Sequence, residues 1–295
     1  MRCGTTWLYR VLSQHPSIGM SEPKQTEFFN RHILTHDLEW YLARFEPPAG
    51  ESWQPVRGEI TPFYCRLPER SVRSIAGLLP DVKLLLNIRD PIERTWSQVV
   101  YDFAYYKKRP FNQVTPGEII RHIDRRRTRL YNDYVRMIRV WSGAFRKEAL
   151  HIGLYDELRS EPVVFVRRIL SHLGLPTDWE PPPDLAATKV YSGAELVGSK
   201  QEVPDYVRWH LAKEYYDSTA ELDRLLGGKV EPWLRGMDEW RNRGRTSWKV
   251  RRTLNRAFLE LPERLAYAAY SVWDGERIAS RVRRLQADQR DRSHS

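Results

Sequence analysis

Apolar residues along the chain follow two spacings, one typical of strands and one typical of helices. Residues 82–88 form a mainly apolar run, which predicts a strand buried on both faces of a parallel sheet. Shorter runs predict further strands, at residues 17–20, 56–60 and 149–154. Apolar positions at helical spacing predict helices at residues 8–15, 37–45, 67–79, 92–98, 127–145, 162–173 and 205–226.

Strands and helices therefore alternate, which predicts an α/β fold of the P-loop type: three layers, with a central parallel sheet flanked by helices. In the helix at 205–226, one side carries Leu211, Tyr215, Leu222 and Leu225. A length of 295 residues is ample for one such core. We expect a main domain over residues 1–240 and a basic helical extension over residues 241–295.

The chain opens on a candidate anion-binding loop. Arg2, Gly4, Thr5 and Thr6 stand directly before the first helix, and supply a cation, a flexible backbone position and two hydroxyls. A glycine allows close approach of a ligand to the free N–H groups of the helix. The alternative is an ordinary threonine N-cap preceded by a chance glycine.

The first strand of the predicted fold is missing from this pattern. A phosphate-binding loop normally follows a buried strand, yet only Met1 precedes Arg2. Two explanations stay open. Met1 is an internal methionine of a longer chain, or the fold has lost its first strand.

A second candidate site follows the strand at 82–88. Arg89 stands at its carboxyl end, where open α/β sheets bind ligands, and Ser97 follows about two helical turns later. The alternatives are a salt bridge from Arg89 to Asp90 or Glu93, and a solvated Ser97. No Gly-Lys-Ser/Thr triplet occurs, which disfavours a P-loop kinase or nucleotide hydrolase.

Together these two motifs resemble the sulfotransferases that use 3'-phosphoadenylyl sulfate (PAPS). The resemblance implies that the opening loop holds the 5'-phosphosulfate, through Arg2, Cys3, Gly4, Thr5, Thr6 and Trp7. It implies that the second motif holds the 3'-phosphate, and this motif is matched by Arg89, Asp90, Pro91, Arg94 and Ser97. Either motif alone would be weak; the pair at this spacing is specific.

Further stretches resemble the glycan-modifying branch, the heparan-sulfate-type enzymes and their bacterial relatives. They are residues 24–29, residues 58–64, and Tyr134 with Trp141 ahead of the strand at 150–154. Ser199 and Lys200 weakly resemble the late loop that clamps the 3'-phosphate. The resemblance covers roughly residues 1–235.

The chain departs from the family pattern at two catalytic positions. Arg2 replaces the loop lysine, and its planar fork is not equivalent to a compact ammonium. Gln25 replaces the glutamate that is the expected base for the acceptor. We therefore take Glu27 as the first candidate for the base, with Glu22 and Glu59 as alternatives, and Lys24 with Arg2 as the groups that stabilise charge.

The sequence thus predicts transfer of a sulfonate group from PAPS to a hydroxyl or amine, on an acceptor that is a glycan or glycolipid, leaving the product PAP. No Cys/His cluster has zinc spacing, and we expect no metal. The non-enzyme alternative is a catalytically impaired nucleotide-binding or membrane-associated relative, as Arg2, Gln25 and the missing strand would allow. A P-loop kinase ranks below both.

Charge is concentrated at the end of the chain. Residues 241–295 hold 14 Arg and Lys against 6 Asp and Glu, which is +8 of the net charge of +10. Apolar residues recur there at helical spacing: Leu261, Leu265, Ala268, Ala269, Val272, Ile278, Val282 and Leu285. This pattern fits a helix pair packed on the core, an anchor at a membrane surface, or a basic rim for an acidic glycan.

No motif supports nucleic-acid binding, and none is expected. The sequence shows no secretory segment and no apolar run of membrane-spanning length. We therefore expect a cytoplasmic protein, with peripheral membrane contact as an option. An N-terminal signal or anchor would be hidden if Met1 is internal.

Overall fold

The computed structural model describes residues 1–47, 50, 52–184, 202–243, 277 and 279–286. Its strands are β1 (Ile18–Met20), β2 (Val56–Gly58), β3 (Leu84–Ile88) and β4 (Leu150–Leu154). Its α-helices are α1 (Thr5–Leu12), α2 (Leu38–Leu42), α3 (Glu69–Leu78), α4 (Pro91–Tyr101), α5 (Pro116–Ile123), α6 (Arg126–Leu130), α7 (Tyr134–Ala144), α8 (Tyr155–Ser160), α9 (Pro162–Leu173), α12 (Asp205–Leu225) and α13 (Glu231–Arg243). Short 3-10 turns lie at His32–Leu34, Ala43–Phe45, Pro62–Arg66, Phe111–Gln113 and Lys147–Ala149.

The strands form two parallel pairs. β1 pairs with β2, with Ile18 opposite Val56, and β3 pairs with β4, with Leu84 opposite Leu150. The predicted parallel pairing is therefore confirmed. The described strands nevertheless make two sheets of two strands rather than one continuous sheet.

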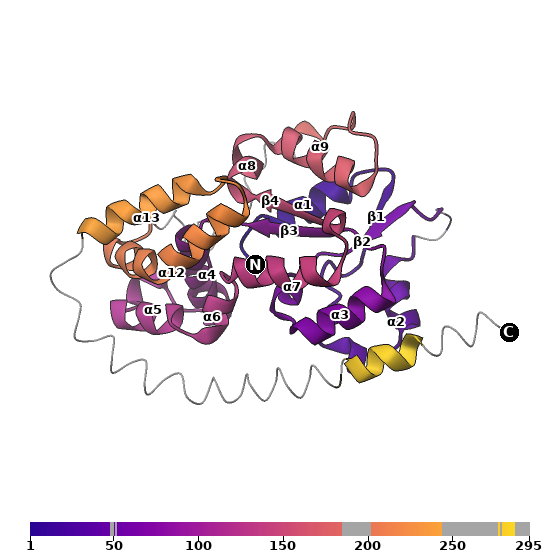
Figure 1. The fold of residues 1–295 in the computed structure, drawn as a ribbon, viewed down its shortest axis with the longest axis horizontal. Helices are drawn as coiled ribbons and strands as arrows, with labels where there is room; N and C mark the ends of the chain where they lie inside the picture. The colour runs from indigo at the N-terminus through magenta and orange to yellow at the C-terminus, as the bar shows by residue number, and fades with distance from the viewer. Residues whose placement is uncertain (48–49, 51, 185–201, 244–276, 278, 287–295) are drawn as a thin grey trace.

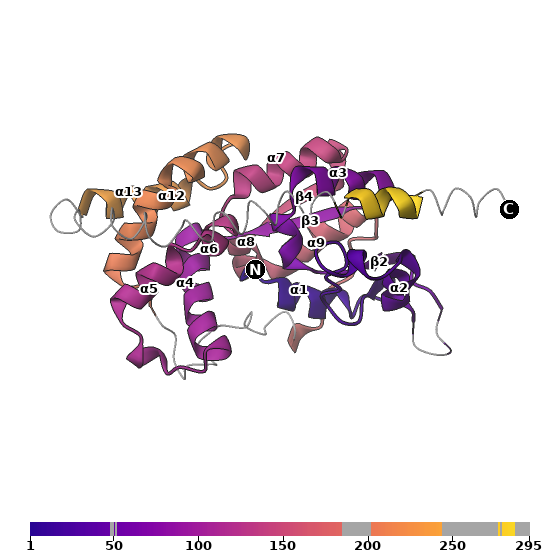
Figure 2. The same ribbon diagram turned by 90° about the horizontal axis from the view of Figure 1, so that it is seen from below.

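Helices cover β3 and β4 on both faces, in three layers. α1 and α9 lie on one face and α3 and α7 on the other (Figures 1 and 2). Successive β3 residues belong to different apolar clusters, since Leu85 packs with α1 and α9 while Leu86 packs with α7. This arrangement is the predicted three-layer α/β fold.

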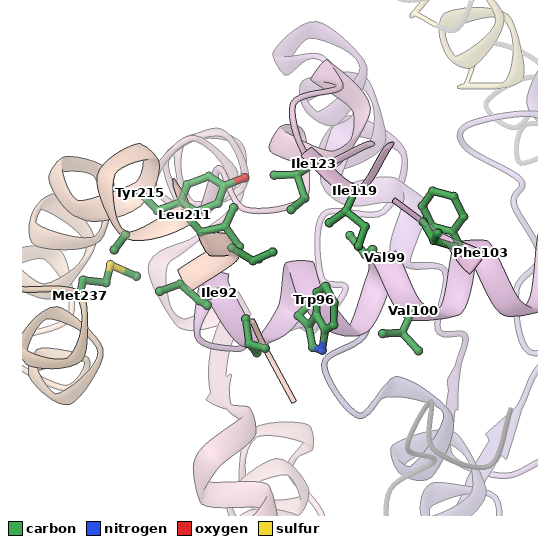
Figure 3. Packing of buried hydrophobic residues seen from close by; sticks show 14 residues of the cluster. Ile92, Trp96, Val99, Val100, Phe103, Ile119, Ile123, Leu211, Tyr215 and Met237 are labelled. Carbon is green, nitrogen blue, oxygen red and sulfur yellow. The ribbon is translucent and has the colours of Figure 1, made fainter. Parts of the chain in front are cut away.

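A separate apolar cluster joins α4 to the later helices. Trp96 and Val99 of α4 meet Ile123 of α5, Leu211 of α12 and Met237 of α13 (Figure 3). This packing fixes the axis of α4, the helix that carries Ser97. Leu225, expected on the same buried side of α12 as Leu211, is instead 47% exposed because it lies in the last turn of that helix.

One predicted helix is divided in two. The apolar pattern over 127–145 continues through a break between α6 and α7, where Asp133 caps α7 by accepting from the N–H of Arg136 at 3.3 Å. The buried side chain of Asn132 turns inward at the same break, to Arg94 and Thr95 of α4. This tertiary contact overrides the helical pattern.

Part of the predicted C-terminal extension packs on the core. Residues 279–286 are helical, and Val282 and Leu285 are buried in the cluster that contains Val72 and Ile75 of α3. The division at residue 240 falls inside α13, and the two-part organisation stays a prediction. The rest of the extension, except Arg241 to Arg243 and Arg277, lies outside the described residues.

Candidate anion-binding site

The opening loop turns into α1 at a glycine that no other residue could replace without strain. Gly4 is the N-cap of α1 with φ of 78°, in the left-handed region. A Cβ atom built on Gly4 would lie 2.8 Å from Cδ1 of Leu158. The glycine also offers no capping side chain to the first N–H groups of α1. These groups form the donor end of a helix, which favours an anion.

The two motifs found in the sequence meet at this loop. Nε of Arg2 donates to Oγ of Ser97 on α4 at 3.0 Å. Nη1 of Arg89, at the carboxyl end of β3, donates to the backbone oxygen of Arg2 at 3.5 Å. The side chains predicted to hold the two ends of one ligand therefore come together, across more than 85 residues of sequence.

A third cation reaches the same helix end from the loop after β1. Nζ of Lys24 lies 3.4 Å from Oγ1 of Thr5 and 3.4 Å from Oγ1 of Thr6. Three cationic side chains thus converge on the first turn of α1. Neutral hydroxyls rather than carboxylates are the partners of Lys24 there.

Burial destabilises the charges of this cluster. It lowers the pKa of the Lys24 ammonium to about 8. Burial also lowers the pKa of the Arg2 guanidinium, and the neighbouring charge of Arg89 lowers it further. Cations with lowered pKa values gain from an incoming anion, because an opposite charge restores the stability of the charged form.

Aromatic rings support two of the cations, and the sequence analysis missed both. The guanidinium of Arg2 lies 4.6 Å from the ring centroid of Tyr101, and that of Arg89 lies 4.5 Å from the ring of Tyr155. Their positions in the sequence would have indicated both tyrosines. Tyr101 follows Ser97 by one helical turn, and Tyr155 directly follows the predicted strand β4.

The acidic residues beside Arg89 have separate roles. Asp90 caps α4, accepting from the N–H groups of Ile92 at 2.8 Å and Glu93 at 3.0 Å, and burial raises its pKa to about 6. Nη2 of Arg89 lies 3.5 Å from Oε2 of Glu93. The salt bridge considered from the sequence is thus present with Glu93, whose side chain is 40% exposed.

Two residues of the sequence motifs hold the backbone around the site in place. Arg94 is fully buried and donates to Asn132 and to the backbone oxygen of Thr128, which anchors α4. The hydroxyl of Tyr134 donates to the backbone oxygen of Arg89 at 2.8 Å, which fixes the end of β3. Their side chains hold the scaffold of the anion cluster.

Glu59, an alternative for the base, is instead saturated with hydrogen bonds. Its carboxylate accepts from the hydroxyls of Thr26 at 2.6 Å, Thr61 at 2.5 Å, Tyr64 at 2.8 Å and Tyr41 at 3.0 Å. The N–H of Thr26 donates to it as well, at 3.2 Å. Burial and the charge of Glu59 raise the pKa values of both tyrosines well above their usual range. Glu59 therefore fixes the loop that carries Lys24 and Glu27.

Glu27 lies in that loop with a weaker contact. Its carboxylate accepts from Nδ2 of Asn30 at 3.4 Å, and its N–H donates to Thr61 at 3.3 Å. Glu22 accepts from the hydroxyl of Tyr9 at 3.4 Å. The assignment of Glu27 as the base stays a prediction.

The remaining predicted site residues fall into two groups. Cys3 and Trp7 are buried, Cys3 with its thiol 3.5 Å from the backbone oxygen of Met1 and Trp7 in the cluster of α1 and α9. Ser199 and Lys200 lie outside the described residues. Within the part of the chain that the structure describes, no cluster of His, Cys, Asp and Glu has the makings of a metal site.

Comparison with known proteins decides the family. The sequence model of the sulfotransferase domain family matches residues 1–191, which include both motifs and the cation cluster. The chain belongs to the sulfotransferase domain family. Over 79% of its length it is similar to a sulfotransferase structure from Alicyclobacillus acidocaldarius, with a TM-score of 0.61, 21% identity and 94% of that chain covered. This similarity supports the fold.

Two curated relatives are similar to parts of the chain. The membrane-associated sulfotransferase kil1 of Dictyostelium discoideum is 35% identical over 108 residues, which are 37% of this chain and 22% of that protein. The bifunctional heparan sulfate N-deacetylase/N-sulfotransferase 4 of Mus musculus is 23% identical over 79% of this chain and 30% of its own length. The chain thus matches less than a third of either relative. No described helix of this sulfotransferase is both long and apolar enough to cross a membrane.

Proposed function

We propose that this sulfotransferase moves a sulfonate group from PAPS to a hydroxyl or amine of a carbohydrate acceptor. The observation that carries the proposal is the convergence of Arg2, Lys24 and Arg89 on the glycine-led start of α1. PAPS carries phosphate groups at both the 3' and the 5' position of its ribose, and cationic side chains bind such groups through charge-assisted hydrogen bonds.

The donor groups fit PAPS in two parts. The N–H groups of α1, with Arg2, Lys24, Thr5 and Thr6, would hold the 5'-phosphosulfate, since they surround the helix start. Arg89 and Ser97 would hold the 3'-phosphate. The contact between Arg2 and Ser97 links the two parts.

The proposed reaction is a direct displacement at sulfur. The acceptor oxygen or nitrogen forms the new bond to sulfur, the bond from sulfur to the bridging phosphate oxygen breaks, and PAP leaves. The acceptor proton passes to Glu27. Lys24 and Arg2 stabilise the charge that develops on the leaving phosphate, so that catalysis rests on positioning and electrostatics.

A carbohydrate acceptor is the class that the relatives favour, because several are named as heparan sulfate N-sulfotransferases. Peripheral contact with a membrane surface or an acidic ligand through residues 241–295 remains a separate proposal. Its motivation is the basic charge of that segment.

The test is turnover of PAPS in the presence of N-deacetylated heparan chains, other hydroxyl-bearing glycans, glycolipids and small phenols. We expect sulfonate transfer to a carbohydrate, lost in Lys24→Met and kept in the control Lys213→Met, whose ammonium lies 4.9 Å from the ring of Trp209 on α12. Binding of PAP without transfer to any acceptor would favour the impaired relative. Failure to bind PAP or PAPS would overturn the proposal.

The lowered pKa of Lys24 predicts a pH dependence of nucleotide binding. Lys24 is protonated below pH 8 and loses its charge above it, whereas bound PAP raises the pKa toward its usual value. Affinity for PAP should therefore be full near pH 7 and fall between pH 8 and 10, by up to about tenfold per pH unit. Titration calorimetry across this range measures it.

Lys24→Arg is the control for this pH dependence, because a guanidinium stays charged throughout the range. The pKa of Asp90, about 6, and that of Tyr101, about 12, lie outside it. A flat profile in the unmodified protein, or the same fall in Lys24→Arg, would exclude Lys24 as the titrating group.

A further inference from the structure

One carboxylate in the first turn of α4 joins two arginines from distant parts of the chain. Oε2 of Glu93 lies 3.5 Å from Nη2 of Arg89. Oε1 of the same carboxylate accepts from Nη1 of Arg208 at 3.4 Å, 115 residues further along the sequence. The two arginines contact different oxygens of Glu93, so either contact can persist when the other is broken.

Glu93 lies between the two groups that we assign to the 3'-phosphate. It contacts Arg89 on one side, and on α4 it stands one helical turn before Ser97, on the same face of the helix. An anion held by both Arg89 and Ser97 would therefore lie close to a carboxylate of the same sign. Like charges at this range repel, and a guanidinium held by a carboxylate has fewer N–H groups for a phosphate.

Arg208 is held in place from three directions. It lies in the first turn of α12, and its Nε donates to the backbone oxygen of Val203 at 3.2 Å. Its guanidinium lies 5.9 Å from the ring centroid of Trp240 on α13. Beside it, Ile92 of α4 and Val207 of α12 are buried in one apolar cluster (Figure 3). Packing of α4 against α12 thus fixes the distance between Arg208 and the helix that carries Glu93.

The 3'-phosphate takes no part in the proposed reaction, since the bond that breaks lies at the 5' end. Contacts on the 3' side therefore hold PAPS and PAP alike, and they contribute uniform binding. A carboxylate that draws Arg89 away from the phosphate weakens the binding of both nucleotides. A second guanidinium that holds this carboxylate reduces that effect.

We propose that Glu93 competes with the 3'-phosphate for Arg89, and that Arg208 limits this competition by holding the Glu93 carboxylate. Arg208 is then a positioning residue of the nucleotide site, which acts through Glu93. The inference rests on the proposed function, because Arg89 meets a 3'-phosphate only if the donor is PAPS.

The test is a double-mutant cycle of Glu93→Gln and Arg208→Gln in the full chain. Titration calorimetry at about 20 mM salt, where screening is weak, measures the affinities for PAP and for adenosine 5'-phosphate. Glu93→Gln should tighten PAP binding by about two- to fivefold, and Arg208→Gln should weaken it by about two- to fivefold, the usual range for partly exposed ion pairs.

The two substitutions should not act independently. When glutamine stands at residue 93, Arg208→Gln should change PAP affinity by less than about twofold, because it has no carboxylate to hold. Affinity for adenosine 5'-phosphate should stay constant throughout the cycle. The changes in PAP affinity should shrink at about 0.5 M salt, whereas a loss of structure would not follow the salt concentration in this way.

The matched control is Glu231→Gln, which removes a carboxylate from the first turn of α13. Glu231 pairs with Arg235 four residues away, the same spacing as Arg89 and Glu93. This variant should leave both affinities unchanged. The melting temperature of each variant shows whether its fold is kept.

Three results would overturn the inference. Weaker PAP binding in Glu93→Gln would mean that Glu93 orients Arg89 toward the phosphate. An equal loss from Arg208→Gln with either residue at position 93 would mean that Arg208 acts without Glu93. Unchanged PAP affinity in both single variants would exclude any role. If the unmodified chain binds neither PAP nor PAPS, the proposed function itself is wrong, and the inference fails with it.

Discussion

Replacement of Arg89 by alanine is expected to weaken binding of PAP by about 10- to 100-fold, as for loss of a charge-assisted hydrogen bond. Binding of adenosine 5'-phosphate, which lacks the 3'-phosphate, should change by less than about threefold. The reason is position. Arg89 at the end of β3 donates to the backbone oxygen of Arg2, whose side chain contacts Ser97, and we assign Arg89 and Ser97 to the 3'-phosphate. Titration calorimetry with both nucleotides measures the difference.

The matched control is Arg235→Ala, which removes an exposed guanidinium whose side chain pairs with Glu231 on α13. It should leave both affinities unchanged. If Arg89→Ala weakens the binding of both nucleotides equally, the Arg89 side chain supports the loop through the backbone oxygen of Arg2 and does not bind the 3'-phosphate.

The fold was predictable from the sequence where the apolar spacing within a single strand or helix was enough to identify that element. The strands β3 and β4 and the helices α1, α3, α9 and α12 follow from apolar spacing within a few residues of their bounds. The division between α6 and α7 did not, because it depends on Asn132 turning toward Arg94, 38 residues away. The short helix α8 was missed because it follows β4 without a break.

The site was predictable in its parts and less so in its contacts. The spacing of the two motifs predicted Arg2, Arg89 and Ser97 as site residues, and the structure brings them together. The role of Glu59 was hidden, because its partners Thr26 and Tyr41 lie 33 and 18 residues away in an irregular region. Periodicity places residues on faces of helices and strands, and it says little about loops that are fixed by side-chain hydrogen bonds.

Replacement of Glu27 by glutamine is expected to lower turnover by about 100- to 10,000-fold, the usual contribution of a general base. Affinity for PAP should stay within about twofold, because glutamine keeps the size of the side chain and its hydrogen bond to Asn30. Single-turnover rates and calorimetry with PAP measure the two effects separately.

Glu59→Gln is the comparison that makes the Glu27 result decisive. An amide at residue 59 accepts through one oxygen only, so it would lose the bonds made to the other oxygen, either those from the hydroxyls of Thr26 and Thr61 or those from the hydroxyls of Tyr41 and Tyr64. We expect this variant to lose roughly 2–3 kcal/mol of stability, as when buried hydrogen bonds to a charged group are broken, with a fall in PAP affinity as the loop that carries Lys24 loosens. A general base changes the rate alone, whereas a structural anchor changes melting and binding together. If Glu27→Gln melts early and binds PAP poorly while Glu59→Gln keeps its fold and loses only turnover, the two roles are reversed and the acceptor proton goes to Glu59.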